Sequence, residues 1–189
     1  IALRPEHTAS VCRAYAQHRP TPPWKVWYSG PNFRYERPQA GRFRQFDQVG
    51  IEVLGVDDPL LDVEVITLGW QFYESVGLKN VSLIVNSLGD AGDRARYVEA
   101  LAAYFSDRAD QLSKEALATL EKYPLRVLDS KREQDAEVIA SAPTIGQFLS
   151  ASAAEHFAAV CAGLEALDIP FTVNERLVRG LDYYRRTTF

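Results

Sequence analysis

The stretch that decides the fold of this chain runs from residue 28 to residue 55 and reads YSGPNFRYERPQAGRFRQFDQVGIEVLG. Its β-branched and aromatic residues lie on both sides of residues 38–41 (PQAG), which contain the Pro and Gly that a turn requires. The pattern predicts two strands joined as a long hairpin. Alternate residues of a strand share a face, so the even-numbered residues 46–54 form one face and the odd-numbered residues 45–53 the other.

The two faces of the second strand differ in chemistry. On the even-numbered face, Gln48 and Glu52 are separated by Gly50, which has no side chain. This arrangement indicates the floor of a ligand site. The odd-numbered face carries three β-branched side chains, those of Val49, Ile51 and Val53. We expect them to pack into a hydrophobic core.

The first strand shows the same alternation, which places Arg34 and Glu36 on one face. If the faces of the two strands are continuous, these two residues converge with Gln48 and Glu52 on one surface. Such a surface suits a ligand that carries both a phosphate and an ammonium, because a guanidinium forks onto phosphate oxygens and carboxylates accept hydrogen bonds from N–H groups. The alternative, from periodicity alone, is a half-buried hairpin whose polar face is solvated.

The composition is that of an ordinary globular protein. Of 189 residues, 47% are hydrophobic and 24% charged, which suffices for one domain with or without an insertion. No run of 18 apolar residues and no signal-like opening segment is present, so the sequence indicates neither a membrane span nor secretion. Cys12 and Cys161 form neither a disulfide nor a zinc pattern, which favours the reducing cytoplasm.

The charge pattern restricts any contact with nucleic acid to a local patch. The net charge of −4 gives no global footprint for RNA or DNA. A cluster of arginines nevertheless gathers near the hairpin tip: Arg34, Arg37, Arg42 and Arg44.

The two ends of the chain are unusual. The chain contains no Met, starts at Ile1 and stops directly after the strand-like run DYYRRTTF. We therefore expect a piece of a longer protein, cut on both sides.

Strand-like and helical patterns alternate along the rest of the chain. Thr8 is expected to cap a helix that ends before residues 20–23, and Asp62 to cap a second helix that ends at Gly77. The apolar stripe of that second helix consists of Val63, Ile66, Trp70 and Tyr73. The elements expected beyond Gly77 are a buried strand over 81–86, helices over 90–104, 113–122 and 144–167, and a strand over 171–173.

Three segments resemble the histidyl-tRNA synthetases, a family of class II aminoacyl-tRNA synthetases. The hairpin sequence FRYERPQAGRFRQFDQVGIEVLG is similar to their motif 2, and LVRGLDYY at residues 177–184 is very similar to their histidine-specific motif. LRPEHTA at residues 3–9 is similar to LRPEGTA of the family, with His7 where Gly is usual. The resemblance covers essentially all 189 residues.

The resemblance implies an α+β fold, in which helices flank a class II synthetase-type antiparallel sheet and a helical insertion interrupts it. It divides the chain into a catalytic core over residues 1–88, which includes the motif 2 hairpin at 28–55, a helical insertion over 89–170, and a return to the core over 171–189. In the family, an insertion at this place approaches the tRNA acceptor stem. Class II motif 1, motif 3 and the anticodon-binding domain have no counterpart in these 189 residues.

The implied activity is that of a histidine–tRNA ligase. Such an enzyme uses ATP, accompanied by Mg²⁺, to activate L-histidine as histidyl-adenylate, and then transfers the histidyl group to tRNA(His). Negative charge builds on the α-phosphate in the first step, and fixed cations lower that barrier by electrostatic stabilisation. The resemblance implies Arg34 and Arg179 as the catalytic residues on two sides of this phosphate, where many class II enzymes use a metal ion. No metal held by the protein alone is expected.

The resemblance also implies the residues that bind ATP. Arg34 binds the α-phosphate, Phe46 stacks on adenine, Glu36 lies near the adenine amino edge, and Arg42 reaches the outer phosphates.

The implied histidine site combines two kinds of contact. Glu6, Thr8 and Gln48 hold the ammonium, while Glu52 and Tyr184 grip the imidazole. A site that hydrogen-bonds both ring nitrogens leaves buried groups unpaired with any other amino acid, and such sites reject analogues strongly. The full set expected to bind histidine is Glu6, Thr8, Arg34, Gln48, Glu52, Arg179, Tyr183 and Tyr184.

The residues assigned to the histidine site also have simpler structural interpretations, and the sequence departs from the family at three positions. Without the resemblance, Glu6 and Thr8 are helix caps, Arg179 is a turn charge, and Tyr183 and Tyr184 are strand aromatics. The departures from the family are His7, Asp47 and Arg185, of which only His7 is expected to touch the ligand site.

Two other functions also compete with a ligase. One is a non-catalytic paralogue, the regulatory subunit of ATP phosphoribosyltransferase, which shares the fold but usually has a degraded RGLDYY segment. The other is a fragment that binds histidine, ATP or RNA without turnover. For the full-length protein the family implies a cytoplasmic homodimer with no membrane contact.

Overall fold

The computed structural model describes residues 2–178 and 184–189. The chain divides into two compact regions, residues 1–61 and residues 62–189, and each is described by itself. Both regions mix helices with strands, as expected for the α+β class. The predicted boundaries at residues 88 and 170 stay predictions.

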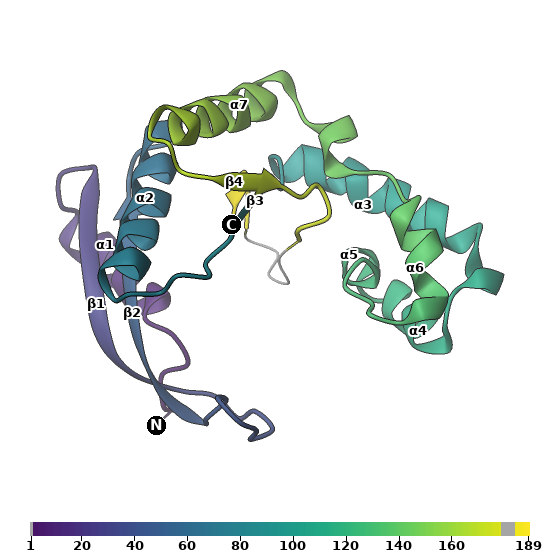
Figure 1. Ribbon diagram of the computed structural model, residues 1–189, viewed down its shortest axis with the longest axis horizontal. Helices are drawn as coiled ribbons and strands as arrows, with labels where there is room; N and C mark the ends of the chain where they lie inside the picture. Colours follow the sequence, from purple (N-terminus) through teal and green to yellow (C-terminus); the bar gives the residue numbers. More distant parts are fainter. Residues whose placement is uncertain (1, 179–183) are drawn as a thin grey trace. The chain divides into compact units, whose positions relative to one another are not determined.

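The first region consists of a helix and the predicted hairpin. Helix α1 (Thr8–His18) precedes strands β1 (Trp24–Phe33) and β2 (Gln45–Leu54), which Figure 1 shows as a long curved ribbon. The strands pair antiparallel, from Trp24 opposite Leu54 to Phe33 opposite Gln45.

The hairpin differs from the prediction near its tip. Strand β1 ends at Phe33, so Arg34 and Glu36 do not share the face of a strand. The physical reason is a tight turn, because the Glu36 N–H donates to the Arg34 carbonyl oxygen at 3.0 Å. Beyond it, Gln39 and Arg42 form an isolated bridge that closes the tip, and Gly41 adopts a φ of +74° there.

The hairpin buries its even-numbered face rather than its odd-numbered one. Val49 is 58% exposed and Trp27 on the neighbouring strand 74% exposed, and no residue of this face belongs to a hydrophobic cluster in the part of the chain that the structure describes. The expected core contribution of Val49, Ile51 and Val53 is therefore wrong. The cause is the segment before the hairpin: helix α1 contacts β2, and the Phe33 N–H donates to the Arg4 carbonyl oxygen at 2.9 Å.

The caps of the first two helices also differ from the prediction. Helix α1 has His7 at its N-cap position, and the Thr8 hydroxyl bonds to Glu52 instead of capping the helix. Helix α2 (Pro59–Ser75) begins before Asp62, because Pro59 suits a first helical position and Asp58 accepts from the Leu60 N–H at 2.8 Å. Asp62 instead lies 2.8 Å from His156. Gly77 ends α2 as predicted, with a φ of +80°.

The second region contains a small sheet. Its strands are β3 (Leu83–Ser87), β4 (Phe171–Val173) and β5 (Thr187–Thr188), in the order β4-β3-β5. Strand β3 pairs parallel with β4 and antiparallel with β5, which makes this sheet mixed. Helices α2 and α7 (Ala151–Ala166) pack with it. Their shared cluster comprises Val63, Ile66, Val85, Val160, Leu164 and Ile169.

The remainder of the second region is helical, as predicted. Helices α3 (Ala91–Ser106), α4 (Lys114–Leu120), α5 (Pro124–Val127) and α6 (Glu133–Ala140) surround a second cluster that includes Tyr97, Leu101, Phe105 and Val138. Short 3₁₀ turns span Ala109–Gln111 and Ile145–Phe148.

The continuous helix predicted over residues 144–167 is wrong. The 3₁₀ turn comes first, and α7 starts only after Ser150. The cause is a local cap, because the Ser150 hydroxyl oxygen accepts from the Ala153 N–H at 3.3 Å and so fixes a new helix start.

One buried carboxylate ties the helical part together. Asp135 is fully buried and accepts from the Ser113 N–H at 2.7 Å, the Ser113 hydroxyl at 2.8 Å and the Ser130 hydroxyl at 2.5 Å. Burial by itself raises the pKa of Asp135, but the hydrogen bonds from Ser130 and Ser113 outweigh it and hold that pKa below its usual value.

Candidate active site

The candidate site lies on the buried face of the hairpin. The strand register places Val26 opposite Glu52, Tyr28 opposite Gly50, and Asn32 opposite Phe46. Residues directly opposite in an antiparallel pair share a face. We call this surface the inner face and define it by Val26, Tyr28, Asn32, Phe46, Gln48 and Glu52.

The segment before α1 is fastened beside the inner face. The Arg4 Nε donates to the Pro31 carbonyl oxygen at 2.8 Å, and the Arg34 Nε donates to the Pro5 carbonyl oxygen at 3.0 Å. The Thr8 hydroxyl donates to the Glu52 Oε1 at 2.5 Å, across 44 residues of sequence. Two predicted histidine-binding residues from separate sequence segments thus meet directly.

Tyr28 adds a third group to this meeting point. Burial raises the pKa of Tyr28 above its usual value, hydrogen bonding to Thr8 lowers it, and the negative charges of Glu52 and Glu6 raise it again. Glu6 itself is half-buried. Sequence analysis missed Tyr28, although its even number and its register opposite Gly50 are the signal that places it on this face.

The gap above Gly50 is occupied by an aromatic ring. A Cβ on Gly50 would lie 2.3 Å from the Tyr28 ring carbon Cζ, so Tyr28 crosses the space left by the missing side chain. The imidazole of His7 stacks on that ring, with centroids 4.5 Å apart and planes 14° from parallel. The space at Gly50 is therefore filled by Tyr28 rather than open, and the prediction that this face is the floor of a ligand site stays a prediction. A glycine opposite an aromatic residue lets the ring lie flat on the strand, and the sequence pattern alone does not reveal which of the two uses the gap.

Gln48 is held by a residue that sequence analysis did not single out. The Asn32 Nδ2 donates to the Gln48 Oε1 at 2.6 Å, and the Asn32 side chain is completely buried. The sequence pattern could have indicated this contact, because Asn32 and Gln48 fall on the same face at diagonal positions of the hairpin.

The predicted ATP residues form two separate pairs. The Arg34 guanidinium lies over the Phe46 ring, 5.1 Å from its centroid. At the tip, the Arg42 Nε lies 2.6 Å from the Glu36 Oε2. The expected convergence of Glu36 with Arg34, Gln48 and Glu52 on one strand surface is not observed, because β1 ends before Glu36.

The remaining predicted residues belong to the second region. Arg179 and Tyr183 lie outside the described residues. Tyr184 is 40% exposed, and its carbonyl oxygen accepts from the Arg94 Nη1 at 3.4 Å. It lines a groove beside helix α3 together with Arg185 and Val98.

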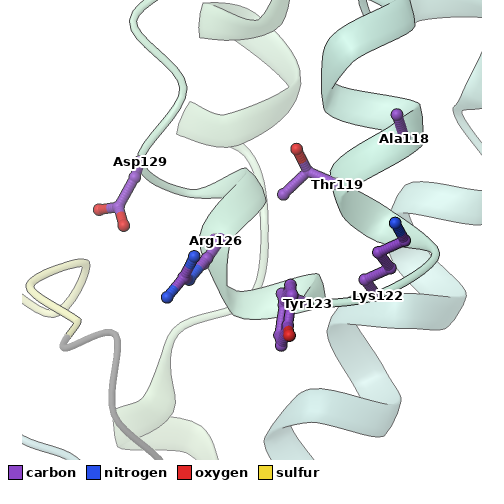
Figure 2. Close-up of a pocket in the computed structure, with 6 residues that line it drawn as sticks. All are labelled: Ala118, Thr119, Lys122, Tyr123, Arg126 and Asp129. Carbon is purple, nitrogen blue, oxygen red and sulfur yellow. The ribbon is translucent and has the colours of Figure 1, made fainter.

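A surface depression of the helical part contains none of the predicted residues. Figure 2 shows its lining, in which Arg126 of α5 and Lys122 of the preceding turn present basic groups. The Arg126 guanidinium carbon lies 4.9 Å from the centroid of the Tyr123 ring. The lining residues are Ala118, Thr119, Lys122, Tyr123, Arg126 and Asp129.

Among residues 2–178 and 184–189, no helix has the length and apolar character needed to cross a membrane. In the same ranges, no group of three or more His, Cys, Asp or Glu side chains is arranged to hold a metal ion.

Comparisons with known proteins place these observations in a family. The chain matches the family described as histidyl-tRNA synthetase over residues 1–189. It is 49% identical to a histidine–tRNA ligase of Geobacillus thermodenitrificans (strain NG80-2) and 50% identical to one of Desulfitobacterium hafniense (strain DSM 10664 / DCB-2), and both alignments cover 100% of this chain and 45% of the relative. The chain thus spans about half the length of the curated relatives it matches.

Solved structures agree with the sequence comparisons. The crystal structure of apo S. aureus histidyl-tRNA synthetase matches 97% of this chain and 43% of its own, with a TM-score of 0.74 and 37% identity. A structure titled an ATP phosphoribosyltransferase regulatory subunit/histidyl-tRNA synthetase from Bacillus halodurans C matches 97% of this chain and 52% of its own, with a TM-score of 0.63 and 19% identity, and so shows the fold alone. Together with the meeting of Thr8 and Glu52 on the inner face, these matches show that the chain belongs to the histidyl-tRNA synthetase family.

Proposed function

We propose that the protein containing this chain is a histidine–tRNA ligase, which activates L-histidine with ATP and transfers it to tRNA(His). The observation that carries the proposal is the Thr8–Glu52 hydrogen bond, which joins two separate sequence segments at one polar point on the inner face. The 49% identity to named histidine–tRNA ligases over the whole chain supports it.

The hydrogen-bonding groups of the inner face suit the ammonium and the imidazole of histidine. Because Thr8 gives its hydroxyl hydrogen to Glu52, the lone pairs of its oxygen are left to accept from an ammonium. The Glu52 carboxylate has acceptor capacity beyond that one bond and pairs with an imidazole N–H. Half-buried Glu6 adds negative charge near the ammonium. Tyr184 completes the imidazole site in this proposal, and Tyr183 belongs to the wider set of residues proposed to bind histidine.

ATP activation in this proposal uses the two catalytic arginines. A histidine carboxylate oxygen attacks the α-phosphorus, and the bond to pyrophosphate breaks with inversion of the phosphate. Arg34 and Arg179 stabilise the added charge. Arg34 is exposed and rests on the Phe46 ring, so binding of adenine on Phe46 displaces the guanidinium toward the phosphates. Arg42 meets the outer phosphates and Glu36 the adenine amino group.

Mg²⁺ enters this proposal as a companion of ATP. Mg²⁺ keeps several waters and binds substrate phosphates with one or two carboxylates rather than an all-protein cage. Glu36 is not a ligand of the ion in this proposal, because it is paired with Arg42 and is assigned to the adenine amino group. Bound Mg²⁺ neutralises the outer phosphates and makes pyrophosphate a better leaving group.

The partners follow from the reaction. We propose that the whole protein is a cytoplasmic homodimer and that tRNA(His) contacts basic side chains locally. The exposed arginines at the hairpin tip and the helical part are the surfaces proposed for that contact.

The regulatory subunit of ATP phosphoribosyltransferase is the second candidate. A fold match at 19% identity favours it less than 49% identity to ligases does. Pyrophosphate exchange that depends on L-histidine separates the two, because only a ligase forms the adenylate.

The direct test of the proposed function is the substitution Glu52→Gln in the full-length protein. A hydrogen bond to a charged group contributes about 1.5–3 kcal/mol, so histidine affinity should fall by roughly tenfold to a hundredfold while ATP affinity stays within about twofold. Isothermal titration calorimetry measures both. Glu155→Gln removes an exposed carboxylate from α7 and serves as the matched control. Unchanged histidine affinity in Glu52→Gln would contradict the role of Glu52.

A further inference from the structure

We infer that Arg4 is a positioning residue that couples the two substrate sites proposed for the hairpin region. It fastens the segment of residues 4–8, which carries groups for the histidine ammonium and also orients the arginine proposed for the α-phosphate. The inference rests on the proposed function and gives a role to a residue that sequence analysis left without one. Its consequence is that histidine and ATP each strengthen the binding of the other.

Arg4 is bonded to strand β1 through both its backbone and its side chain. Its carbonyl oxygen accepts from the Phe33 N–H at 2.9 Å, and its Nε donates to the Pro31 carbonyl oxygen at 2.8 Å. Gly30 leaves room for the guanidinium, because a Cβ there would lie 3.2 Å from the Arg4 Nη2. Since Pro5 follows, Arg4 is also restricted to extended backbone conformations. These restraints set where the next residues of the segment lie.

The segment of residues 4–8 contributes to both proposed sites. At one end, the Thr8 hydroxyl donates to the Glu52 Oε1, and Glu6 is half-buried. At the other end, the Pro5 carbonyl oxygen accepts from the Arg34 Nε at 3.0 Å. The carbonyl is the only hydrogen-bonding group that a proline backbone has. A shift of the segment therefore changes the ammonium site and the orientation of Arg34 together.

The bond to Pro5 presets the direction of the Arg34 guanidinium. An arginine Nε carries one hydrogen, so this bond has a single polarity and leaves the four Nη hydrogens for phosphate oxygens. Arg34 is exposed, and an exposed arginine without such a bond has much rotamer freedom to lose when it binds a phosphate. Holding the Nε in place lowers that entropic cost.

Bound histidine makes this restraint firmer. Its ammonium bonds to the Thr8 oxygen and lies near Glu6 in the proposed site, so the ligand confines the segment and, through Pro5, also Arg34. ATP then meets an arginine that is already oriented. The coupling amounts to at most one hydrogen bond of an exposed group, which corresponds to about threefold to tenfold in affinity. By thermodynamic linkage, ATP tightens histidine binding by the same factor.

Arg4→Met in the full-length protein is the first test, because methionine keeps an unbranched apolar stem and has no N–H donor in its side chain. Isothermal titration calorimetry measures ATP affinity with and without saturating L-histidinol. Histidinol has the ammonium and the imidazole of histidine but no carboxylate, so no adenylate forms. In the parent protein, histidinol should tighten ATP binding about threefold to tenfold. In Arg4→Met this factor should fall close to one, while ATP affinity without histidinol stays within about twofold of the parent value.

The ratio of the two ATP affinities distinguishes positioning from a structural role. A merely structural contact would lower the unfolding midpoint, or weaken ATP binding in both conditions alike, and would leave the ratio unchanged. Arg13→Met removes an exposed arginine from α1 and is the matched control. It should keep the coupling of the parent protein.

Arg34→Met tests the other end of the connection. It should show no tightening of ATP binding by histidinol, and the addition of Arg4→Met should change the ratio no further. Arg34 is exposed, so this variant also decides the inference if Arg4→Met does not fold. If the parent protein fails to bind L-histidine or ATP, the proposed function is overturned, and this inference with it. If the parent binds both but histidinol leaves ATP affinity unchanged, or if either variant keeps the parent's coupling, the inference alone is overturned.

Discussion

The two regions of the molecule bury different kinds of side chain. In the described part of residues 1–61, the buried residues are His7, which is 7% exposed, and Asn32, which is completely buried, and both are polar. In residues 62–189, the fully buried side chains are mainly hydrophobic and include Tyr97, Leu101 and Phe105. The first region therefore uses its interior for hydrogen-bonding groups, while the second uses it for apolar packing.

Because of this difference, we expect the first region to contribute mainly to ligand binding and the second mainly to the stability of the fold. Buried apolar surface stabilises a fold in proportion to its area, whereas a buried polar group costs free energy unless it is hydrogen-bonded. The hairpin has no buried apolar residue to offset such costs within its own described residues. We therefore expect substitutions in the hairpin to alter ligand binding with modest effects on unfolding, and substitutions in the helical clusters to do the reverse.

The largest expected effect on stability comes from Phe105→Ala. Phe105 is completely buried among the side chains of the helical cluster, and truncating such a residue costs about 3–5 kcal/mol. Denaturant unfolding should show this loss, while histidine affinity of the folded protein stays unchanged at low temperature. A normal unfolding midpoint, or a loss of histidine affinity without a loss of stability, would contradict the division between a binding region and a stabilising region.

The largest expected effect on activity comes from the two arginines that we propose to be catalytic. Arg34→Ala and Arg179→Ala should each slow adenylate formation about a hundredfold or more, by analogy with the loss of one oxyanion donor. Arg34 is exposed but donates to the Pro5 carbonyl oxygen, so its substitution should lower the free energy of unfolding by only about 0.5–1.5 kcal/mol. Pyrophosphate exchange reports this step directly. Arg13→Ala on exposed helix α1 is the control, and exchange at the parent rate by either catalytic variant contradicts its role.

A smaller effect tests the contact between Tyr28 and Gly50. In Gly50→Ala the new methyl group would lie 2.3 Å from the Tyr28 ring, which forces a shift that costs about 1–3 kcal/mol. Tyr28 should leave its place beside Thr8 and Glu52, so histidine affinity falls as well. Gly69→Ala in α2 meets nothing within 4 Å and should instead stabilise by about 0.5–1 kcal/mol. If both substitutions behave alike in thermal unfolding, the close contact at Gly50 is not real.

The smallest expected effect is the pH dependence that Asp135 gives to the second region. Its folded-state pKa lies below its unfolded value near 3.8, so its stabilising contribution is present above that pH and is lost as the pH falls through the folded pKa. Urea unfolding at pH 7 and at decreasing pH below 4 should show the parent approaching Asp135→Asn in stability. A gap between the two proteins that persists unchanged in strong acid would contradict this origin.

Sequence patterns were most successful where a local signal acts alone. The hairpin, the helix end at Gly77 and the strand at 171–173 follow from turn residues and β-branched runs, and the structure confirms them. Of the apolar stripe predicted for α2, Val63 and Ile66 are buried, whereas Tyr73 is 45% exposed. The site residues of the hairpin follow from family motifs and stay predictions, although Thr8 and Glu52 do lie in contact.

The sequence by itself determined roughly where the hairpin and most of the helices lie, and which residues share a face within the paired strands, because these depend on periods of two and about 3.6 residues along the chain. It did not determine which hairpin face is buried. Only the tertiary structure decided that, through the segment at Arg4 and helix α1, which lie beside the even-numbered face and leave Val49 exposed. The partners of Asn32 and Tyr28 were decided in the same way. Hairpin alternation places Asn32 and Gln48 on one face, but whether their side chains bond depends on chain packing in three dimensions. The bond between Thr8 and Glu52 across 44 residues depends on that packing too.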